Sequence, residues 1–123
     1  MESKMVNNEK YLKDKTFIVI PAYNEEKNIG KVISGLKKEG YENIVVVDDG
    51  SKDKTFKIAY DFGCWVLKHP LNLGKGAALK TGADFALIKG AKKIVFMDSD
   101  NQHLPIDVPR FVKKLDDSQI VFG

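Results

Sequence analysis

The stretch IVVVDDGSKDKT, residues 44–55, joins four β-branched residues directly to a loop of aspartate, glycine and serine. A short apolar run without polar alternation is typical of a β-strand that is covered on both faces. Working outward, comparable runs lie at 17–20 (FIVI), 94–97 (IVFM) and 120–122 (IVF), with a weaker one at 65–67 (WVL). We therefore expect five strands, of which the last is cut short at Gly123.

Amphipathic helices are expected between these strands. Apolar residues recur at helical spacing within 29–36, 56–60, 79–87 and 111–115. Glycines suited to ending a helix follow the first three of these segments, at Gly40, Gly63 and Gly90. The alternation of strand and helix predicts an α/β fold, with a mainly parallel, Rossmann-like sheet flanked by helices. We expect this unit to occupy residues 16–123, after a polar, loosely ordered arm at residues 1–15.

The composition is that of a soluble globular protein, with 43% hydrophobic and 30% charged residues among 123. The net charge of +3 is small and the lysines are spread along the chain, which disfavours nucleic acid as a partner. Cys64 is the only cysteine, so no disulfide can form within the chain and a reducing, cytoplasmic location is expected. No apolar run approaches the ~20 residues of a membrane-spanning helix, so any membrane contact would be peripheral.

The segments that follow the predicted strands are rich in polar and turn residues. They read PAYNEE (21–26), DDGS (48–51), HPLNLGKG (69–76) and DSDNQH (98–103). Segments at the opposite strand ends, such as KEGYEN at 38–43, are plainer. Because ligands of parallel sheets bind outside the carboxyl ends of the strands, we expect the chemistry to lie at this one edge.

The sharpest motif is Asp98-Ser99-Asp100, directly after the fourth strand. Two carboxylates at this spacing can converge on Mg²⁺ or Mn²⁺; a magnesium ion typically takes one or two protein carboxylates together with water and phosphate oxygens. Gln102 can add an oxygen ligand. The alternative is a solvated turn or a helix cap, and the position after a buried strand favours the metal. His103, which trails the motif, is either a site residue or a packed loop residue.

The two loops before this motif each allow two interpretations. Asp48 can accept a hydrogen bond from a base N–H or a ribose hydroxyl, whereas Asp49 or Ser51 can cap the next helix. Tyr23 can stack on a base, whereas a plain strand-to-helix turn capped by Asn24 explains the same stretch. Both interpretations stay open for each loop.

Lys75 lies between two glycines at the start of a predicted helix. Glycine lets the backbone approach a ligand, and lysine can meet the charge of a phosphate. The Walker spacing G-x-x-x-x-G-K-[ST] and the dinucleotide fingerprint G-x-G-x-x-G are both absent. We therefore predict that this loop contacts phosphate without being a Walker loop or a dinucleotide-binding loop. We interpret His69, earlier in the segment, as a loop residue.

Together these loops resemble the family 2 glycosyltransferases with the GT-A fold, and among them the polyprenyl- and dolichyl-phosphate sugar transferases. The similar stretches are IVIPAYNEE (18–26), VVVDDGSKDKT (45–55), NLGKGAALKTG (72–82) and VFMDSDNQHLP (95–105). The resemblance implies an inverting transfer from a nucleoside-diphosphate sugar, with Mg²⁺ or Mn²⁺ as cofactor. It also implies polyprenyl phosphate as an acceptor, which would bring the chain to the cytoplasmic membrane face.

The resemblance further implies roles for individual residues. Asp98, Asp100 and Gln102 would hold the metal against the donor diphosphate. The residues expected to contact the nucleotide are Pro21, Ala22, Tyr23, Glu25, Val46, Asp48, Lys75 and Asp98. Because family members continue well beyond Gly123, we expect the acceptor site and the catalytic base to lie in a missing second half.

Two other functions remain open at this point. A sugar nucleotidyltransferase also has an α/β nucleotide fold, but it usually carries a Gly- and Arg-rich loop after the first strand, where this chain has PAYNE. A non-catalytic nucleotide-binding or assembly module is the other alternative, because the chain ends inside a strand. The sheet edge left open by the shortened strand favours a homodimer.

Overall fold

The sheet is the frame that positions every loop of interest. In the computed structural model, which describes residues 15–99 and 120–122, the strands follow the order β3-β2-β1-β4-β5. All neighbouring pairs are parallel, so their carboxyl ends meet at one edge. The strands are β1 (Thr16–Ala22), β2 (Ile44–Asp48), β3 (Trp65–Lys68), β4 (Lys93–Phe96) and β5 (Ile120–Phe122). The predicted α/β fold with a parallel sheet is confirmed.

β1 runs through the middle of the sheet and pairs with β2 on one side and β4 on the other. Its residue Ile18 is in register with Ile44 of β2 and with Val95 of β4. Every residue of β1 and β2 is buried, as expected for apolar runs covered on both faces. β3 departs from that expectation, because it borders only β2 among the described strands and leaves Trp65 and Lys68 exposed.

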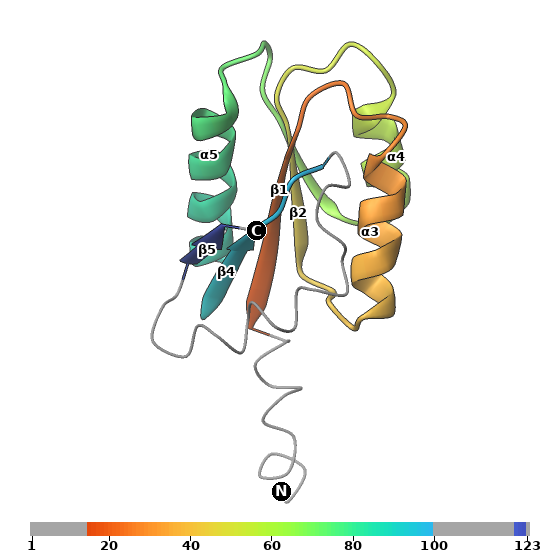
Figure 1. The fold of residues 1–123 in the computed structure, drawn as a ribbon. Helices are drawn as coiled ribbons and strands as arrows, with labels where there is room; N and C mark the ends of the chain where they lie inside the picture. Colours follow the sequence, from red (N-terminus) through yellow and green to blue (C-terminus); the bar gives the residue numbers. More distant parts are fainter. Residues whose placement is uncertain (1–14, 100–119, 123) are drawn as a thin grey trace, which may run out of the picture.

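Helices cover both faces of the sheet, as Figure 1 shows. Helix α5 (Lys75–Ile88) lies on one face, and α3 (Ile29–Lys38) and α4 (Thr55–Asp61) lie together on the other. The alternation along β1 divides its side chains between these layers: Ile18 and Ile20 pack in the core beneath α3 and α4, and Val19 packs in the core beneath α5. Each face of the sheet therefore has its own apolar core.

The two larger helices meet the sheet in different ways. α3 buries the apolar stripe that its spacing predicts, namely Ile29, Val32, Ile33 and Leu36. α5 instead buries small residues, Ala78, Gly82 and Ala86. The sequence pattern placed Leu87 on the inner face of this helix, but Leu87 is 58% exposed. Small residues face the sheet because α5 lies so close to it that a Cβ on Gly82 would collide with Val19.

Several predictions fall on residues outside the described ranges. These are the arm at 1–15 up to residue 14, the helix at 111–115, and the side chains of Asp100, Gln102 and His103. Within the described residues, none of the helices has both the length and the apolar character needed to span a membrane.

Candidate functional site

The loops that follow β1 and β2 are fastened to each other at the carboxyl edge. The Asn24 N–H donates to Ser51 Oγ at 2.8 Å, and Asn24 Oδ1 accepts from the Lys52 N–H at 2.9 Å. Asn24 has a φ of 55°, a left-handed conformation that asparagine tolerates better than most residues. Asn24 therefore joins the two loops and does not cap α3, which begins five residues later at Ile29.

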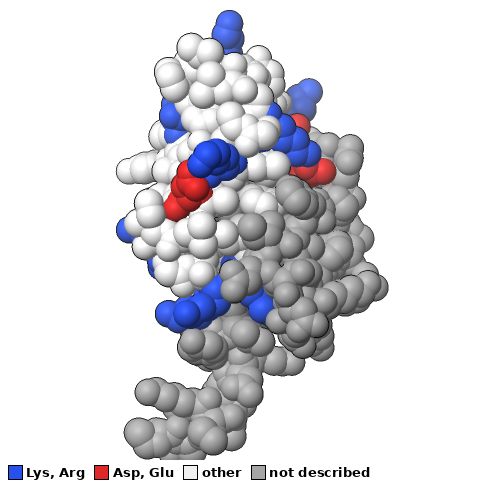
Figure 2. Space-filling model, turned by 90° about the vertical axis from the view of Figure 1, so that its left-hand side faces the viewer, with Lys and Arg blue, Asp and Glu red and all other residues white. Residues whose placement is uncertain are grey.

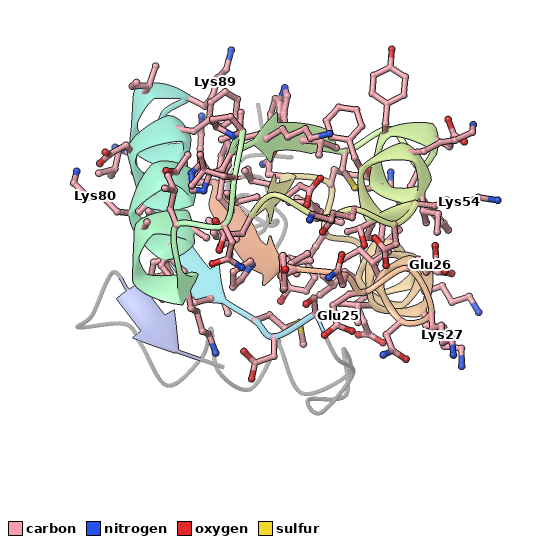
Figure 3. All side chains as sticks on the ribbon, turned by 90° about the horizontal axis from the view of Figure 1, so that it is seen from above. Glu25, Glu26, Lys27, Lys54, Lys80 and Lys89 are labelled. Carbon is pink, nitrogen blue, oxygen red and sulfur yellow. The ribbon has the colours of Figure 1, made fainter. Side chains whose placement is uncertain are left out.

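A second set of hydrogen bonds continues this connection toward α4. The Glu25 N–H donates to Thr55 Oγ1 at 2.8 Å, and the Lys54 N–H donates to Glu26 Oε1 at 3.0 Å. Figure 3 shows Glu26 and Lys54 close together on this side of the edge. Asp53 Oδ1 accepts from the Thr55 N–H at 2.9 Å and so serves the start of α4. The sequence-based suggestion that Asp49 or Ser51 caps this helix is therefore wrong.

Asp53 is held as a carboxylate by this arrangement. Burial on its own raises the pKa of the Asp53 carboxyl, but hydrogen bonds from Thr55 and from the Glu26 N–H outweigh it. The net result is a pKa below the ordinary value. The side chain is thus a fixed acceptor that ties the first loop to the second.

Asp48 closes β2 and is fully buried. Its Oδ1 accepts from the Ser51 N–H at 3.0 Å, which tightens the turn after the strand. Its Oδ2 is buried and has no hydrogen-bond partner among the described residues. Because a buried carboxylate oxygen without a donor is costly, this atom is suited to receive one from a ligand. Val46, two residues earlier, is packed in the core beneath α3.

Asp49, the next residue, has a different environment. Its Oδ1 accepts from the Leu73 N–H and its Oδ2 from the Gly74 N–H, both at 2.9 Å. His69 Nδ1 lies 2.8 Å from Oδ1, and His69 Nε2 lies 2.9 Å from Thr81 Oγ1. His69 is buried, with 8% of its surface exposed, and was interpreted from the sequence only as a loop residue.

These hydrogen bonds determine the charge of Asp49. Burial raises the pKa of its carboxyl, but the donors from His69, Leu73 and Gly74 outweigh burial and bring the pKa below the ordinary value. The one signal for this cluster in the sequence was position, since Asp49 and His69 both follow the ends of neighbouring strands. Gly50 allows the close approach, because its φ is +81° and a Cβ there would lie 2.6 Å from Asn72 N.

A cleft of about 250 Å³ opens at the carboxyl edge above β1. Its walls come from the segments that follow β1, β2, β3 and β4. The lining residues are Pro21, Ala22, Tyr23, Glu25, Asp49, Asn72, Gly74, Lys75, Ala78, Asp98 and Ser99. Six residues of the predicted nucleotide site thus border one cavity, whereas Val46 and Asp48 are fully buried and do not line it.

Lys75 and Asp98 face each other across this cleft. Lys75 Nζ lies 2.7 Å from Asp98 Oδ1, with the lysine side chain 64% exposed and the aspartate 25%. The lysine comes from the first turn of α5 and the aspartate from the segment after β4. Lys75 is the only cation that lines the cleft among the described residues, against three carboxylates, those of Glu25, Asp49 and Asp98.

The described part of the site offers a limited set of metal ligands. Asp98 has a partly exposed carboxylate, while the oxygens of Asp49 are engaged by three donors. Among the described residues, no group of three His, Cys, Asp or Glu side chains is placed to hold a metal. One partly exposed carboxylate beside an open cleft nevertheless fits Mg²⁺, because this ion takes most of its ligands from water and substrate phosphates.

The outer surface of α5 contrasts with the cleft. Figure 2 shows lysine and acidic side chains scattered singly or in pairs among uncharged atoms on that side of the molecule. One pair is Lys80 with Asp84, whose Nζ and Oδ2 atoms are 2.8 Å apart on the exposed helix surface. Lys80 points away from the sheet in Figure 3, whereas Lys89 Nζ lies 5.9 Å from the ring centroid of Trp65 in β3. These residues provide controls that leave the cleft untouched.

The parallel sheet and its edge cleft define an α/β protein with a candidate ligand site at the carboxyl ends of its strands. The family model for glycosyl transferase family 2 matches residues 17–123, and the chain belongs to that family. The predicted family membership is therefore confirmed.

The chain is similar both to uncharacterized proteins and to proteins named for a transferase activity. The chain is 55% identical over 101 residues to the uncharacterized protein MJ1222 of Methanocaldococcus jannaschii, covering 82% of this chain and 42% of the relative. It is 36% identical over 126 residues to a UDP-N-acetylglucosamine–dolichyl-phosphate N-acetylglucosaminyltransferase of Methanococcus voltae, covering 87% of this chain and 50% of that protein. The chain thus spans half or less of the length of these relatives.

Solved structures agree with the fold. Glucosyl-3-phosphoglycerate synthase of Mycobacterium tuberculosis, in complex with Mn²⁺, UDP-glucose and phosphoglyceric acid, superposes with a TM-score of 0.69 at 32% identity. The match covers 86% of this chain and 41% of the synthase. The Mn²⁺ and the UDP-glucose belong to that complex, and they indicate which ligands to test here.

Proposed function

We propose that this chain is the donor-binding part of a metal-dependent, inverting sugar transferase that uses a nucleoside-diphosphate sugar. The observation that carries the proposal is the carboxyl-edge cleft, which brings Tyr23, Lys75 and Asp98 together from three separate segments. An aromatic ring, a cation and a carboxylate are the groups needed for a base, a diphosphate and a metal ion. The family match and the nucleotide-bound neighbour support the same assignment.

The nucleoside would occupy the side of the cleft formed after β1. Tyr23 is 45% exposed and lines the cleft, so its ring is free to stack on a base. Pro21, Ala22 and Glu25 form the adjoining wall. Asp48 does not line the cleft, but its unpartnered Oδ2 lies at the end of β2, in register with Ala22, which does. It would accept a hydrogen bond from the base if the bound nucleoside displaces the residues that cover it. Val46 supports this end of the sheet from the core.

The diphosphate would lie at the start of α5. Phosphate is stabilised at a helix N-terminus by free N–H groups and by the helix dipole. Gly74 and Gly76 have open space where a Cβ would lie, so a ligand can approach the backbone there. Lys75 adds a positive charge at the same place. Asp98, together with Asp100 and Gln102, would hold Mg²⁺ or Mn²⁺, which stabilises the charge that develops on the leaving diphosphate.

The acceptor is proposed to be a polyprenyl phosphate. The support comes from the named activities of two relatives. One is the dolichyl-phosphate N-acetylglucosaminyltransferase, and the other is the polyprenol monophosphomannose synthase of Mycolicibacterium smegmatis, to which the chain is 31% identical over 109 residues. A lipid acceptor would place the protein at the cytoplasmic face of a membrane. Asp49 and Asp98 are engaged by other groups in the cleft, so neither is the catalytic base of this proposal.

The location of the base pocket is tested by Tyr23→Ala. Base–aromatic stacking is worth ~1–3 kcal/mol, so the variant should bind UDP or GDP roughly 5- to 150-fold more weakly in calorimetry with Mn²⁺. Tyr60→Ala is the matched control, because Tyr60 is 66% exposed on α4 and does not line the cleft. Equal losses in both variants, or none in either, would place the base elsewhere.

Transfer itself is tested with radiolabelled UDP- and GDP-linked sugars and a polyprenyl phosphate. Labelled lipid should form with a chain extended past Gly123 to the length of the relatives. Tight nucleotide binding without labelled lipid from any donor would instead favour a non-catalytic nucleotide-binding module.

A further inference from the structure

A line of hydrogen bonds, buried between Asp49 and His69 and partly buried between His69 and Thr81, runs beside the cleft. It joins the end of β2, the residue after β3 and the middle of α5. His69 and Asp49 are 8% and 4% exposed, so their hydrogen bonds are shielded from water. We call this set of three residues the clasp.

The donors and acceptors in the clasp follow from the charge of Asp49. An ionised carboxylate only accepts hydrogen bonds, so His69 Nδ1 must carry the proton that lies toward Asp49. In a neutral ring Nε2 is then the acceptor, and the Thr81 hydroxyl donates to it. If the ring is protonated, the same hydroxyl can accept instead, so the clasp persists in both states.

The order carboxylate, imidazole, hydroxyl is also that of a nucleophilic triad. Such a triad needs its hydroxyl in contact with substrate, but neither His69 nor Thr81 is among the residues that line the cleft. Thr81 instead lies in the second turn of α5 and beyond the first-turn residues that border the cavity. The clasp is therefore placed to hold structure and not to react.

What the clasp holds is one wall of the cleft. The two oxygens of Asp49 take the N–H groups of Leu73 and Gly74, immediately before Lys75. Gly74 has a φ of 105° and precedes the first residue of α5. Asn72, Gly74 and Lys75 all line the cleft, so the position of this wall depends on where the Asp49 carboxylate points.

We propose that His69 is a positioning residue for nucleotide binding, acting through Asp49 to fix the wall formed by residues 72–75. The proposal rests on the proposed function, because it names the nucleotide as the ligand of that wall. His69 orients the carboxylate by donating to Oδ1, which leaves Oδ2 aimed at the Gly74 N–H. Without this donor the carboxylate is held only by the Leu73 and Gly74 N–H groups themselves, so these two loop amides lose an acceptor that is fixed from outside the loop.

The test compares His69→Leu, which has no donor, with His69→Asn, whose amide N–H can occupy the place of Nδ1. Two quantities are measured on the full chain: the Kd for UDP and for GDP with Mn²⁺, and hydrogen exchange at the Leu73 and Gly74 amides without nucleotide. Lys80→Ala on the outer surface of α5 is the control. We expect His69→Leu to bind ~10-fold more weakly and its two amides to exchange ~10-fold faster, while His69→Asn stays within about threefold of wild type in both.

The outcomes separate this proposal from the proposed function. Unchanged affinity in folded His69→Leu would overturn the positioning role, whether or not the amides exchange faster. Failure of wild type to bind either nucleotide would overturn the proposed function, and exchange at Leu73 and Gly74 would then decide whether His69 holds the loop at all. If His69→Leu does not fold, Thr81→Val replaces it: faster exchange and weaker binding than in Lys80→Ala support the clasp, and values equal to the control contradict it.

Discussion

Asp48 and Asp49, adjacent at the end of β2, accept hydrogen bonds from different loops. Asp48 closes the turn through the Ser51 N–H and keeps one buried oxygen without a described partner. Asp49 uses both of its oxygens to fasten the loop before α5. The difference follows from the alternation of side chains along an extended chain, which directs neighbouring residues to opposite sides. Substitutions at the two positions should therefore have different consequences.

Asp49→Asn should lower stability in a pH-dependent manner. The pKa of Asp49 is lowered in the folded state, so its contribution is present above the unfolded value near 4 and is lost as the pH falls through the folded pKa. Urea unfolding should show a deficit of ~2 kcal/mol relative to wild type at pH 7, and a smaller deficit at pH 3. A deficit that stays the same or grows at low pH would contradict the assigned charge.

Lys75→Met should affect metal and nucleotide in opposite directions. In the structure the lysine neutralises Asp98, so its removal should let Mn²⁺ alone bind more tightly at that carboxylate. The same change removes a charged donor to the diphosphate, and nucleotide affinity should fall by ~10-fold or more. Manganese binding can be followed by electron paramagnetic resonance and nucleotide binding by calorimetry. Lys80→Met, on the far side of the same helix, should change neither, and losses of both affinities in Lys75→Met would refute the competition.

At the scale of elements, α5 can pack close to the sheet because Gly82 has no side chain. A Cβ there would collide with Val19 and approach Val47 Cγ2 to 3.1 Å. Gly82→Ala should therefore lower the free energy of unfolding by ~1–3 kcal/mol, because core residues of β1 and β2 must shift. Gly76→Ala in the same helix meets nothing within 4 Å and should be neutral or stabilising by up to ~1 kcal/mol. Urea unfolding of both variants checks this, and equal stabilities would mean that the helix lies farther from the sheet.

The helices and strands differ in how well they could be predicted from the sequence. β1 and β2 were predictable because they are continuous apolar runs buried at every residue, and α3 because its buried residues recur with the period of a helix. The inner face of α5 was harder, since its contact uses alanine and glycine while Leu87 faces solvent. Only small residues fit where α5 lies close to the sheet, and a search for hydrophobic periodicity does not detect alanine and glycine as a buried face. Edge position likewise left β3 half-exposed, which an apolar run alone does not reveal.

For the whole molecule, the parallel arrangement explains why a site could be anticipated at all. All strand ends meet at one edge, so residues as distant in sequence as Tyr23 and Asp98 were expected together and do line one cleft. The clasp was not anticipated, because the contact of Asp49 with His69 and Thr81 depends on how β2, β3 and α5 pack. Side-chain orientation also separated Asp48 from the cleft lining. The sequence pattern predicted which edge of the sheet carries the site, and side-chain packing determined which residues line the cleft.

The central claim is that the cleft binds a nucleoside diphosphate through a metal ion held at Asp98. Calorimetric titration of UDP and GDP into the chain, with Mn²⁺ and then with EDTA, tests it directly. Wild type should bind one nucleotide at least ~10-fold more tightly with Mn²⁺, and Asp98→Asn should lose that gain, whereas Asp84→Asn on the outer surface of α5 should keep it. Equal affinity with Mn²⁺ and with EDTA, or an unchanged metal effect in Asp98→Asn, would contradict the account.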